Sequence, residues 1–388
     1  MIKNKINCTK GDENIMSFFI HTFSLQKNAY YKQAKKIWTC YNDMNIKQED
    51  GIIINHFAEE GLRIQISHRS NIEIHYDKEH KETKIELIIT PYKLLHPGDY
   101  LGKIRNRREM HDASMRLYEL LDEIKSDTGV NLLKGAEIKR IDITKDVITP
   151  SQEYTREIIA VCKATSLQRG YYFCNPAKTQ CELNGWNPQN ACLYKNKSQG
   201  IKVKIYDKQQ NLIDYRKAVA SEETGNGLIR FEISLEKQFL KKKGYLIDEN
   251  YFSILNRVME NASDLFRQYF LLIMDQGEML SFPVLEKYIK CKKGNRSAAK
   301  KMLEFSKIYN YFRKNGKEFD REHFPYSDKK FVGLRIKYVD LGLSPIPLSD
   351  ACPYIPSFQN LFLEDIDMKM YKFAKKHTRG KEIWFDAE

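Results

Sequence analysis

Three short stretches of this sequence alternate apolar and polar residues, and each carries an acidic residue near its centre. They read KIELII at 84–89, RIDITKD at 140–146 and RFEISL at 230–235. Alternation with a period of two predicts half-buried β-strands, whose one face packs on a core while the other meets solvent. Such strands need a mixed or antiparallel sheet with helices against it.

The remaining patterns place further elements around these strands. The stretch at 191–208, ACLYKNKSQGIKVKIYDK, predicts a β-hairpin with Ser198 and Gly200 in its turn. Helical spacing of apolar residues predicts a helix over 111–128 that ends at Gly129, and another over 149–166 with Thr149 as its cap. Beyond about residue 246, helical periodicity dominates at 251–276, 295–316 and 327–342. We therefore expect an α+β fold, with a sheet domain over 1–245 and a mainly helical domain over 246–388.

Composition narrows the class of partner. Of 388 residues, 64 are Lys or Arg and 51 are Asp or Glu, so the net charge is 64 − 51 = +13, which favours a polyanion. No apolar run approaches the ~20 residues of a membrane span, and no secretion signal precedes the eight cysteines, which include no CxxC pair. We expect reduced thiols, no membrane partner and a cytoplasmic protein.

The acidic residues of the three strands are candidate metal ligands. Strands are depleted of Asp in particular, so Glu86, Asp142 and Glu232 together are an unusual set. Carboxylate oxygens suit Mg²⁺ or Mn²⁺, and such a cation could polarise a phosphodiester. The alternative for each residue is an ordinary position on a solvated strand face, paired with Arg140 or Arg230.

Two Tyr-x-Lys pairs lie in 200–217, GIKVKIYDKQQNLIDYRK. Tyr206 precedes Lys208, and Tyr215 precedes Lys217. A phenol with a pKa near ~10 attacks poorly at neutral pH unless a cation, base or metal assists it. Either pair could therefore be a tyrosine nucleophile with a helping cation. The alternative is a strand end that runs into a surface helix.

The stretch at 300–319, KKMLEFSKIYNYFRKNGKEF, interleaves cations with aromatic residues. Lysine and arginine suit phosphates, and aromatic rings can stack on unpaired bases. An amphipathic helix with a buried aromatic face and solvated lysines gives the same pattern. The chain has no His-x-His pair and no nucleotide-binding glycine motif of the GxxxxGK[ST] or GxGxxG type.

The motifs also resemble a known family. KIELIITPYKLLHPGDYLG, EIKRIDITKD, GIKVKIYDK and GLIRFEISLEKQFLKKKGYL occur in that order, and the chain from about 83 to 345 resembles the gene II/X family of phage and plasmid replication proteins. It is also similar to the replication initiation factors of Gram-positive plasmids and integrative elements. Those proteins nick one DNA strand at an origin, stay joined to it through tyrosine and leave a 3′ end for a host polymerase.

The resemblance implies roles for individual residues. Asp142, Glu232 and Glu86 match the strand carboxylates, and Lys208 matches the lysine beside the nucleophile. The plasmid-type pattern assigns the nucleophile to Tyr206, whereas the filamentous-phage pattern points to Tyr215; we favour Tyr206.

Several readings of function follow from these assignments. The implied partners are origin DNA, single- and double-stranded, and a bacterial host's polymerase and helicase. Alternatives are a conjugative relaxase with the same chemistry, a non-catalytic DNA-binding regulator of replication and, more remotely, an RNA-binding protein.

Overall fold

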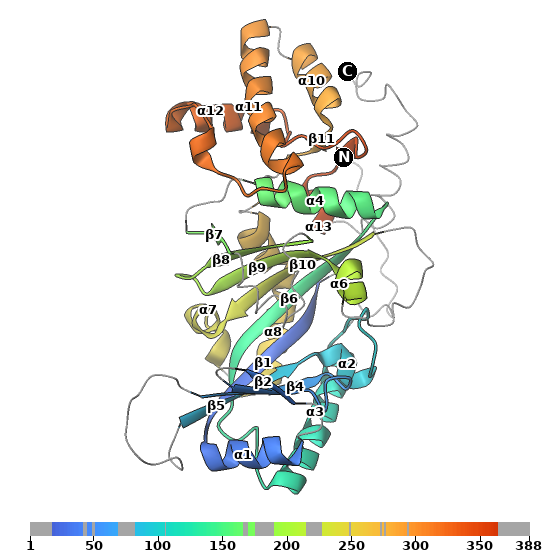
Figure 1. Cartoon of the computed structure of the whole chain (residues 1–388), viewed down its shortest axis with the longest axis vertical. Coiled ribbons are helices and arrows are strands. Elements are labelled where there is room, and N and C mark those ends of the chain that lie inside the picture. Colours follow the sequence, from blue (N-terminus) through green and yellow to red (C-terminus); the bar gives the residue numbers. More distant parts are fainter. Residues whose placement is uncertain are drawn as a thin grey trace, which may run out of the picture. The chain divides into compact units, whose positions relative to one another are not determined.

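The structure is a computed structural model, and its helices and strands form a mixed α/β protein with a large antiparallel sheet (Figure 1). It describes residues 18–41, 45–48, 51–68, 82–104, 106–165, 170–174, 190–214, 227–247, 250–271, 274, 277–292 and 295–363. The chain divides into two compact units, each built from two stretches of sequence. Unit 1 is Met1–Thr144 with Ser234–Ala262, and unit 2 is Lys145–Ile233 with Ser263–Glu388. Within the described ranges, no helix combines the length and apolarity that a membrane crossing requires.

The strands of unit 1 follow the order β2-β3-β4-β5-β1-β6. They are β1 (Phe19–Tyr30), β2 (Asn45–Gln48), β3 (Gly51–Ile54), β4 (Leu62–His68), β5 (Glu82–Ile89) and β6 (Glu137–Thr149), of which β6 continues into unit 2. Each adjacent pair in this order is antiparallel. The first strand of the chain thus lies inside the sheet, between β5 and β6.

Alternation along these strands separates an apolar face from a polar one. Phe23, Leu25, Ile64, Ile85 and Leu87 point to the apolar face and are at most 2% exposed. Helix α1 (Tyr31–Cys40) packs on β1 and β5 and against α3 (Arg107–Thr128), and these two helices lie side by side in Figure 1. Helix α8 (Tyr251–Glu260) also packs on β1. The polar face carries Thr22, Ser24, Gln26, Arg63, Gln65, Lys84, Glu86, Arg140 and Asp142.

Helix α3 confirms the helix predicted over 111–128 but begins at Arg107. The side chain of Asn106 accepts a hydrogen bond from the backbone N–H of Glu109, which satisfies one of the free donors of the first turn. That turn is charged and carries no apolar periodicity, so the pattern missed it. Gly129 ends the helix as predicted, at φ 70°, a left-handed conformation that suits glycine.

The strands of unit 2 follow the order β10-β9-β8-β7. They are β7 (Tyr172–Phe173), β8 (Ala191–Asn196), β9 (Ile201–Asp207) and β10 (Gly227–Glu236), whose last residues belong to unit 1. Strands β8 and β9 are antiparallel, and Gly200 lies in the turn between them at φ 69°. The predicted hairpin is therefore confirmed.

Helices cover the apolar face of these strands. Helix α4 (Gln152–Ala164) contacts β8 and β9 on one side and α11 (Arg296–Lys314) on the other (Figure 1). Phe231 of β10 meets Phe270 and Phe358 edge to face. The other elements are α2 (Pro91–Leu95), α6 (Lys208–Asp214), α7 (Lys237–Lys242), η1 (Tyr245–Ile247), α9 (Ala262–Phe266), η2 (Arg267–Leu271), β11 (Met279–Leu280), α10 (Phe282–Lys292), η3 (Arg321–His323), α12 (Asp328–Val339), β12 (Tyr354–Ile355) and α13 (Phe358–Leu363).

The start of α4 corrects one prediction. Thr149 is not the helix cap, because β6 continues to Thr149 and the N-cap position falls at Ser151. The Thr149 hydroxyl instead shares a 2.7 Å hydrogen bond with the hydroxyl of Thr155. Thr149 thus anchors the first turn of the helix from the end of the strand.

The two units do not follow the division expected at residue 245. Helix α8 belongs to unit 1, where Tyr251 stacks on Phe23 of β1 at 6.1 Å between ring centroids. Strands β8 and β9 belong to unit 2 together with the later helices. The reason is packing: α8 contacts β1, and α11 packs on α4, which in turn contacts β8 and β9.

Candidate active site

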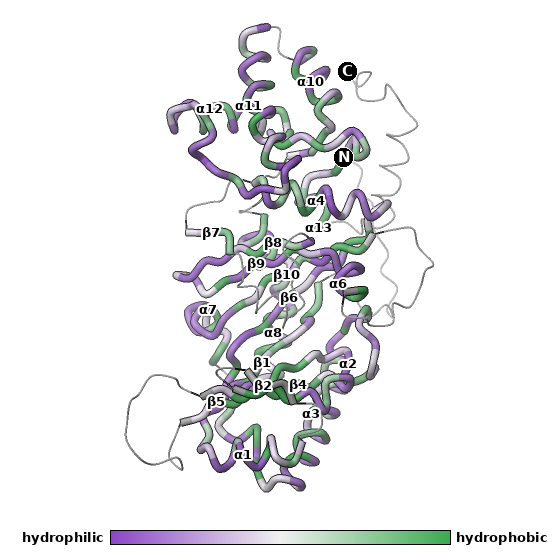
Figure 2. The backbone as a smooth tube through the Cα atoms, in the orientation of Figure 1, coloured by the Kyte–Doolittle hydropathy of each residue, from purple (hydrophilic) through white to green (hydrophobic). Residues whose placement is uncertain are grey.

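The candidate site lies on the polar face of the strands of unit 2. Along β9, buried Ile201, Val203 and Ile205 alternate with Lys202, Lys204 and Tyr206, so hydrophilic and hydrophobic residues alternate along the strand (Figure 2). Tyr206 lies opposite Ala191 in the register with β8. Tyr206 is near the end of the strand, and Lys204 lies on the same face.

An arginine that is completely shielded from solvent lies beside Tyr206. Arg230 of β10 is 0% exposed, and Asp146 of β6 holds it through two parallel hydrogen bonds. Nε donates to Oδ1 at 2.6 Å and Nη2 donates to Oδ2 at 2.7 Å. Burial disfavours the charge of the guanidinium, but the charges of Asp146 and Glu232 and the Tyr206 phenol keep its pKa above the usual value. Arg230 is therefore a fixed cation.

The Arg230 cation acts directly on the pKa of Tyr206. Burial of the phenol raises its pKa, the Arg230 guanidinium lowers it by charge and by a hydrogen bond, and the nearby Glu232 and Asp146 raise it. The net result is a pKa above the usual value, so the phenol is neutral at pH 7. Arg230 therefore lowers the free energy needed to form a phenolate at this position.

The acidic residue predicted on β10 has a lysine partner. Glu232 is 3% exposed, and Nζ of Lys204 donates a hydrogen bond to its Oε1. The pairing with Arg230 considered from the sequence is replaced by one with Lys204. Tyr206, Arg230, Asp146, Glu232 and Lys204 thus form one cluster, which we call the Tyr206 cluster.

The remaining residues of the Tyr-Asp-Lys motif have local roles. Asp207 accepts hydrogen bonds from the backbone N–H of Gln210 at 2.8 Å and from the side chain of Gln152 on α4. Burial raises its pKa, against the effect of these hydrogen bonds. Lys208 is 5% exposed and is the first residue of α6, so it lies beyond the alternation of β9.

Tyr215, the other candidate nucleophile, lies outside the described residues. The choice between Tyr206 and Tyr215 therefore remains a prediction. What the structure adds concerns Tyr206 alone, which has a buried cation beside it.

The two predicted carboxylates of unit 1 do not meet. Glu86 lies opposite Gln26 of β1, whereas Asp142 lies opposite Thr22, on the other side of β1. The offset along β1 is 26 − 22 = 4 residues, or about 13 Å, and two strand spacings add a lateral ~10 Å. One Mg²⁺ with oxygen ligands at ~2.1 Å cannot touch both side chains.

Each of these carboxylates has a basic partner. Nζ of Lys139 donates to Oε2 of Glu86, and Nε of Arg140 lies 3.1 Å from Oδ1 of Asp142. The alternative of an Arg140 pair is thus realised for Asp142. Asp142 is 2% exposed, yet its Oδ1 accepts no hydrogen bond from any described residue.

These observations test the fit to a metal. In the part of the chain that is described, His, Cys, Asp and Glu form no group of three that could hold an ion. Although Arg140 pairs with it at 3.1 Å, the buried Oδ1 of Asp142 has the chemistry of a hard-cation ligand and makes no hydrogen bond to the described residues. Asp142 therefore fits a Mg²⁺ or Mn²⁺ ligand, Glu86 does not fit the same ion, and Glu232 belongs to the other unit.

Sequence reasoning gave no site role to three members of the Tyr206 cluster, which are Arg230, Asp146 and Lys204. Arg230 and Asp146 are 84 residues apart, and only the register of the sheet brings them together. The signal was present in the alternation, since Arg230 and Glu232 share one face of β10. It was read only as a possible partner for the strand acids.

Comparison with other proteins yields no family: no known family model matches the sequence, and no curated protein matches it.

Proposed function

We propose that this protein is a tyrosine-dependent DNA nicking and joining enzyme that initiates rolling-circle replication. The observation that carries the proposal is Tyr206 beside the buried cation Arg230, which Asp146 holds in place. The net charge of +13 supports DNA as substrate. The ordered motifs that resemble replication proteins support an origin as the target.

The proposed reaction is a transesterification. Oη of Tyr206 attacks the scissile phosphorus, and the bond from phosphorus to the 3′ oxygen breaks. The phenol loses its proton, and the leaving oxygen takes one up to become a free 3′-hydroxyl. The 5′ end remains joined to Tyr206 as a phosphotyrosine, and attack by a 3′-hydroxyl reverses the step and joins the strand.

We assign a separate role in the reaction to each of three residues of the Tyr206 cluster. Arg230 stabilises the negative charge that develops on the phenol oxygen and on the phosphate. Asp146 orients the guanidinium through both of its carboxylate oxygens. Glu232 shares its Oε1 with Lys204 and is the anionic group next to the phenol that Arg230 does not hold in a bidentate pair. We assign it the role of accepting the phenol proton.

A divalent cation completes the proposal. Mg²⁺ or Mn²⁺ would polarise the phosphodiester, and Asp142 is the carboxylate proposed to serve as its ligand. Lys208 is proposed to assist at the same phosphate. The nuclease role of the sheet and the DNA- or partner-binding role of the later helices belong to this proposal as well.

The test is a covalent adduct. The protein is incubated with Mg²⁺ and a supercoiled plasmid that carries its replication origin, and the products are resolved with and without protease. We expect a nicked circle with protein on its 5′ end and a free 3′-hydroxyl, and mass spectrometry should map the DNA to Tyr206. Tyr206→Phe should abolish the adduct, whereas Tyr215→Phe should retain it.

Two outcomes would change the proposal. Absence of an adduct from the unaltered protein refutes the nicking reaction. An adduct on Tyr215 moves the nucleophile away from the Tyr206 cluster and refutes the role of Arg230, while it retains the reaction.

A further inference from the structure

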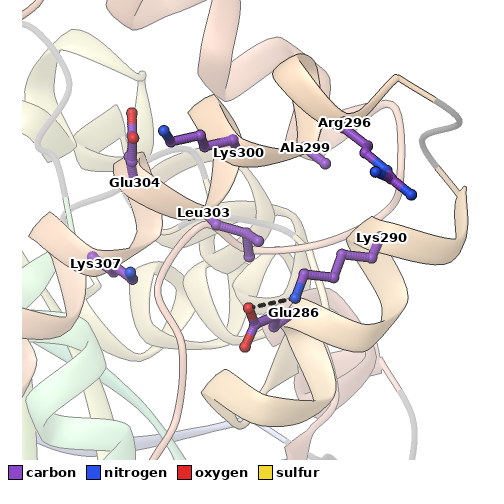
Figure 3. A pocket seen from close by; sticks show the side chains of 8 residues that line it. All are labelled: Glu286, Lys290, Arg296, Ala299, Lys300, Leu303, Glu304 and Lys307. Carbon is purple, nitrogen blue, oxygen red and sulfur yellow. Dashed lines mark ion pairs between the residues drawn. The ribbon is translucent and has the colours of Figure 1, made fainter.

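A groove lies between α10 and α11 in unit 2, apart from the Tyr206 cluster (Figure 3). Its volume is about 540 Å³. The lining residues are Glu286 and Lys290 of α10 with Arg296, Ala299, Lys300, Leu303, Glu304 and Lys307 of α11. Four of them are basic, two are acidic, and none is aromatic.

The floor of the groove is apolar and closed. Ala299 is 4% exposed and Leu303 is 7% exposed. Both point into the groove between the two helices in Figure 3. The polar atoms that a ligand can reach therefore come from the walls.

The charges on the walls are not balanced. Lys290 and Glu286 form an ion pair at 2.9 Å, drawn as the dashed line in Figure 3, and so neutralise each other. Arg296, Lys300 and Lys307 form no ion pair or hydrogen bond with any residue in the described ranges. Only Glu304 opposes these three cations, so the groove carries a net positive charge.

The spacing of these cations makes a straight row. Positions 296, 300 and 307 are separated by four and seven residues, which return to one face of an α-helix. At 1.5 Å per residue the row is about 16 Å long. One strand of duplex DNA rises ~3.4 Å per phosphate while it winds around the axis, which places successive phosphates about 6–7 Å apart, so the row can meet two or three neighbouring phosphates.

We infer that the groove between α10 and α11 binds the phosphate backbone of duplex DNA. Three unpaired cations in a row complement a row of phosphates, and Arg296 can hold a phosphate through two parallel hydrogen bonds. The absence of an aromatic residue among the lining residues argues against single-stranded DNA, whose binding uses stacked bases. The contacts reach phosphates rather than base edges, so they position the duplex and do not read its sequence.

The choice of DNA rests on the proposed function, but the groove can be tested without it. In one variant Arg296, Lys300 and Lys307 are all changed to Gln. The matched control changes Lys301, Lys329 and Lys337 to Gln, which removes the same charge from exposed positions outside the groove. Both are compared as full-length proteins, with circular dichroism and thermal unfolding to show that they fold like the parent.

The readout is the salt dependence of binding. Affinity for a 30-base-pair duplex is measured between 50 and 300 mM NaCl in EDTA, so that no metal-dependent nicking intervenes. Loss of three phosphate contacts should lower the slope of log K against log salt by about 2.7, and binding at 0.15 M salt by about 100-fold. The control should keep the slope of the parent to within about one contact.

The outcomes separate this inference from the proposed function. Equal salt slopes for the groove variant and the control refute the inference that the groove binds duplex DNA. The inference is also refuted if the groove variant lowers the slope for single-stranded DNA or double-stranded RNA but not for the DNA duplex. A groove-dependent slope for duplex DNA in a protein that never forms an adduct supports the groove and refutes the nicking reaction. If the protein forms an adduct but the groove variant keeps the salt slope of the parent, the nicking reaction is supported and binding of duplex DNA by the groove is refuted.

Discussion

Removal of Asp146 should cost more stability than any single surface charge, because it leaves Arg230 charged and buried. The pair is closed to solvent, with side chains 12% and 0% exposed. Loss of one partner from a buried ion pair typically costs about 3–5 kcal/mol. Glu232 stays near the guanidinium and partly compensates its charge. For Asp146→Ala we therefore expect the lower end, about 3 kcal/mol.

Urea unfolding measures this cost. With a slope of about 2 kcal/mol/M, a loss of 3 kcal/mol lowers the midpoint by about 1.5 M. Glu286→Ala is the control within the same unit, since it breaks an exposed helical ion pair that is worth only about 0.3–0.5 kcal/mol. A midpoint for Asp146→Ala within about 0.3 M of that control would show that Asp146 does not hold Arg230 as described.

A double variant then separates stability from chemistry. Arg230→Met with Asp146→Leu replaces the pair by apolar groups and should recover most of the lost stability. It should still form no DNA adduct, because no cation remains beside the phenol of Tyr206. A double variant that nicks DNA as the parent does would refute the proposed role of Arg230.

Substitutions and one titration test other parts of the structure. The register keeps Glu86 away from Asp142. Glu86→Gln should therefore keep the rate of adduct formation within about twofold of the parent, whereas Asp142→Asn should lower it by about 10²-fold. Equal losses for the two variants in a quenched time course would contradict this. A Cβ on Gly227 would stand 2.2 Å from the hydroxyl oxygen of Thr155, so Gly227→Ala should lower the urea midpoint by a cost of about 1–3 kcal/mol, and an unchanged midpoint would disprove the clash. Burial raises the pKa of Tyr154 to about 12, above the unfolded value of ~10, so its contribution to stability is complete below about pH 10 and is lost as pH rises from 10 to 12. The chain has 23 tyrosines, so the absorbance of Tyr154→Phe at 295 nm is subtracted from that of the parent. The difference should rise only between about pH 10 and 12, and a difference that titrates near pH 10 while circular dichroism stays native would contradict the assignment.

Local signals predicted local structure well. The β8–β9 hairpin was predictable because its alternation and its turn glycine, Gly200, lie within one short stretch. Tyr206 lies near the end of β9, at the strand end that the same stretch offered as the alternative to a nucleophile. Strand β9 ends at Asp207, one residue before the predicted end of the hairpin at Lys208. The reason is that the side chain of Asp207 accepts a hydrogen bond from the backbone N–H of Gln210 at the start of α6.

Features that depend on register were not predictable. Glu86 and Asp142 each stand in a strand with the expected alternation, but β1 lies between those strands and displaces the two carboxylates along its length. No local pattern reveals which strand lies between two others. The pairing of Arg230 with Asp146 depends on the same long-range information. Sequence periodicity assigns a residue to a face, and only the completed sheet determines its neighbours.

The division of the chain has a consequence for inheritance. The polypeptide passes between the two units at three places, after Thr144, Ile233 and Ala262. A single crossover between two related genes would therefore deliver at least one unit with segments from different parents, whose packed surfaces had not evolved together. An intact unit 1 could be exchanged only by events with at least three breakpoints, near those junctions. We expect natural variants of such a gene to accumulate point changes rather than whole-unit swaps, and a fragment that starts after residue 262 to lack α4 and β10, against which its helices pack.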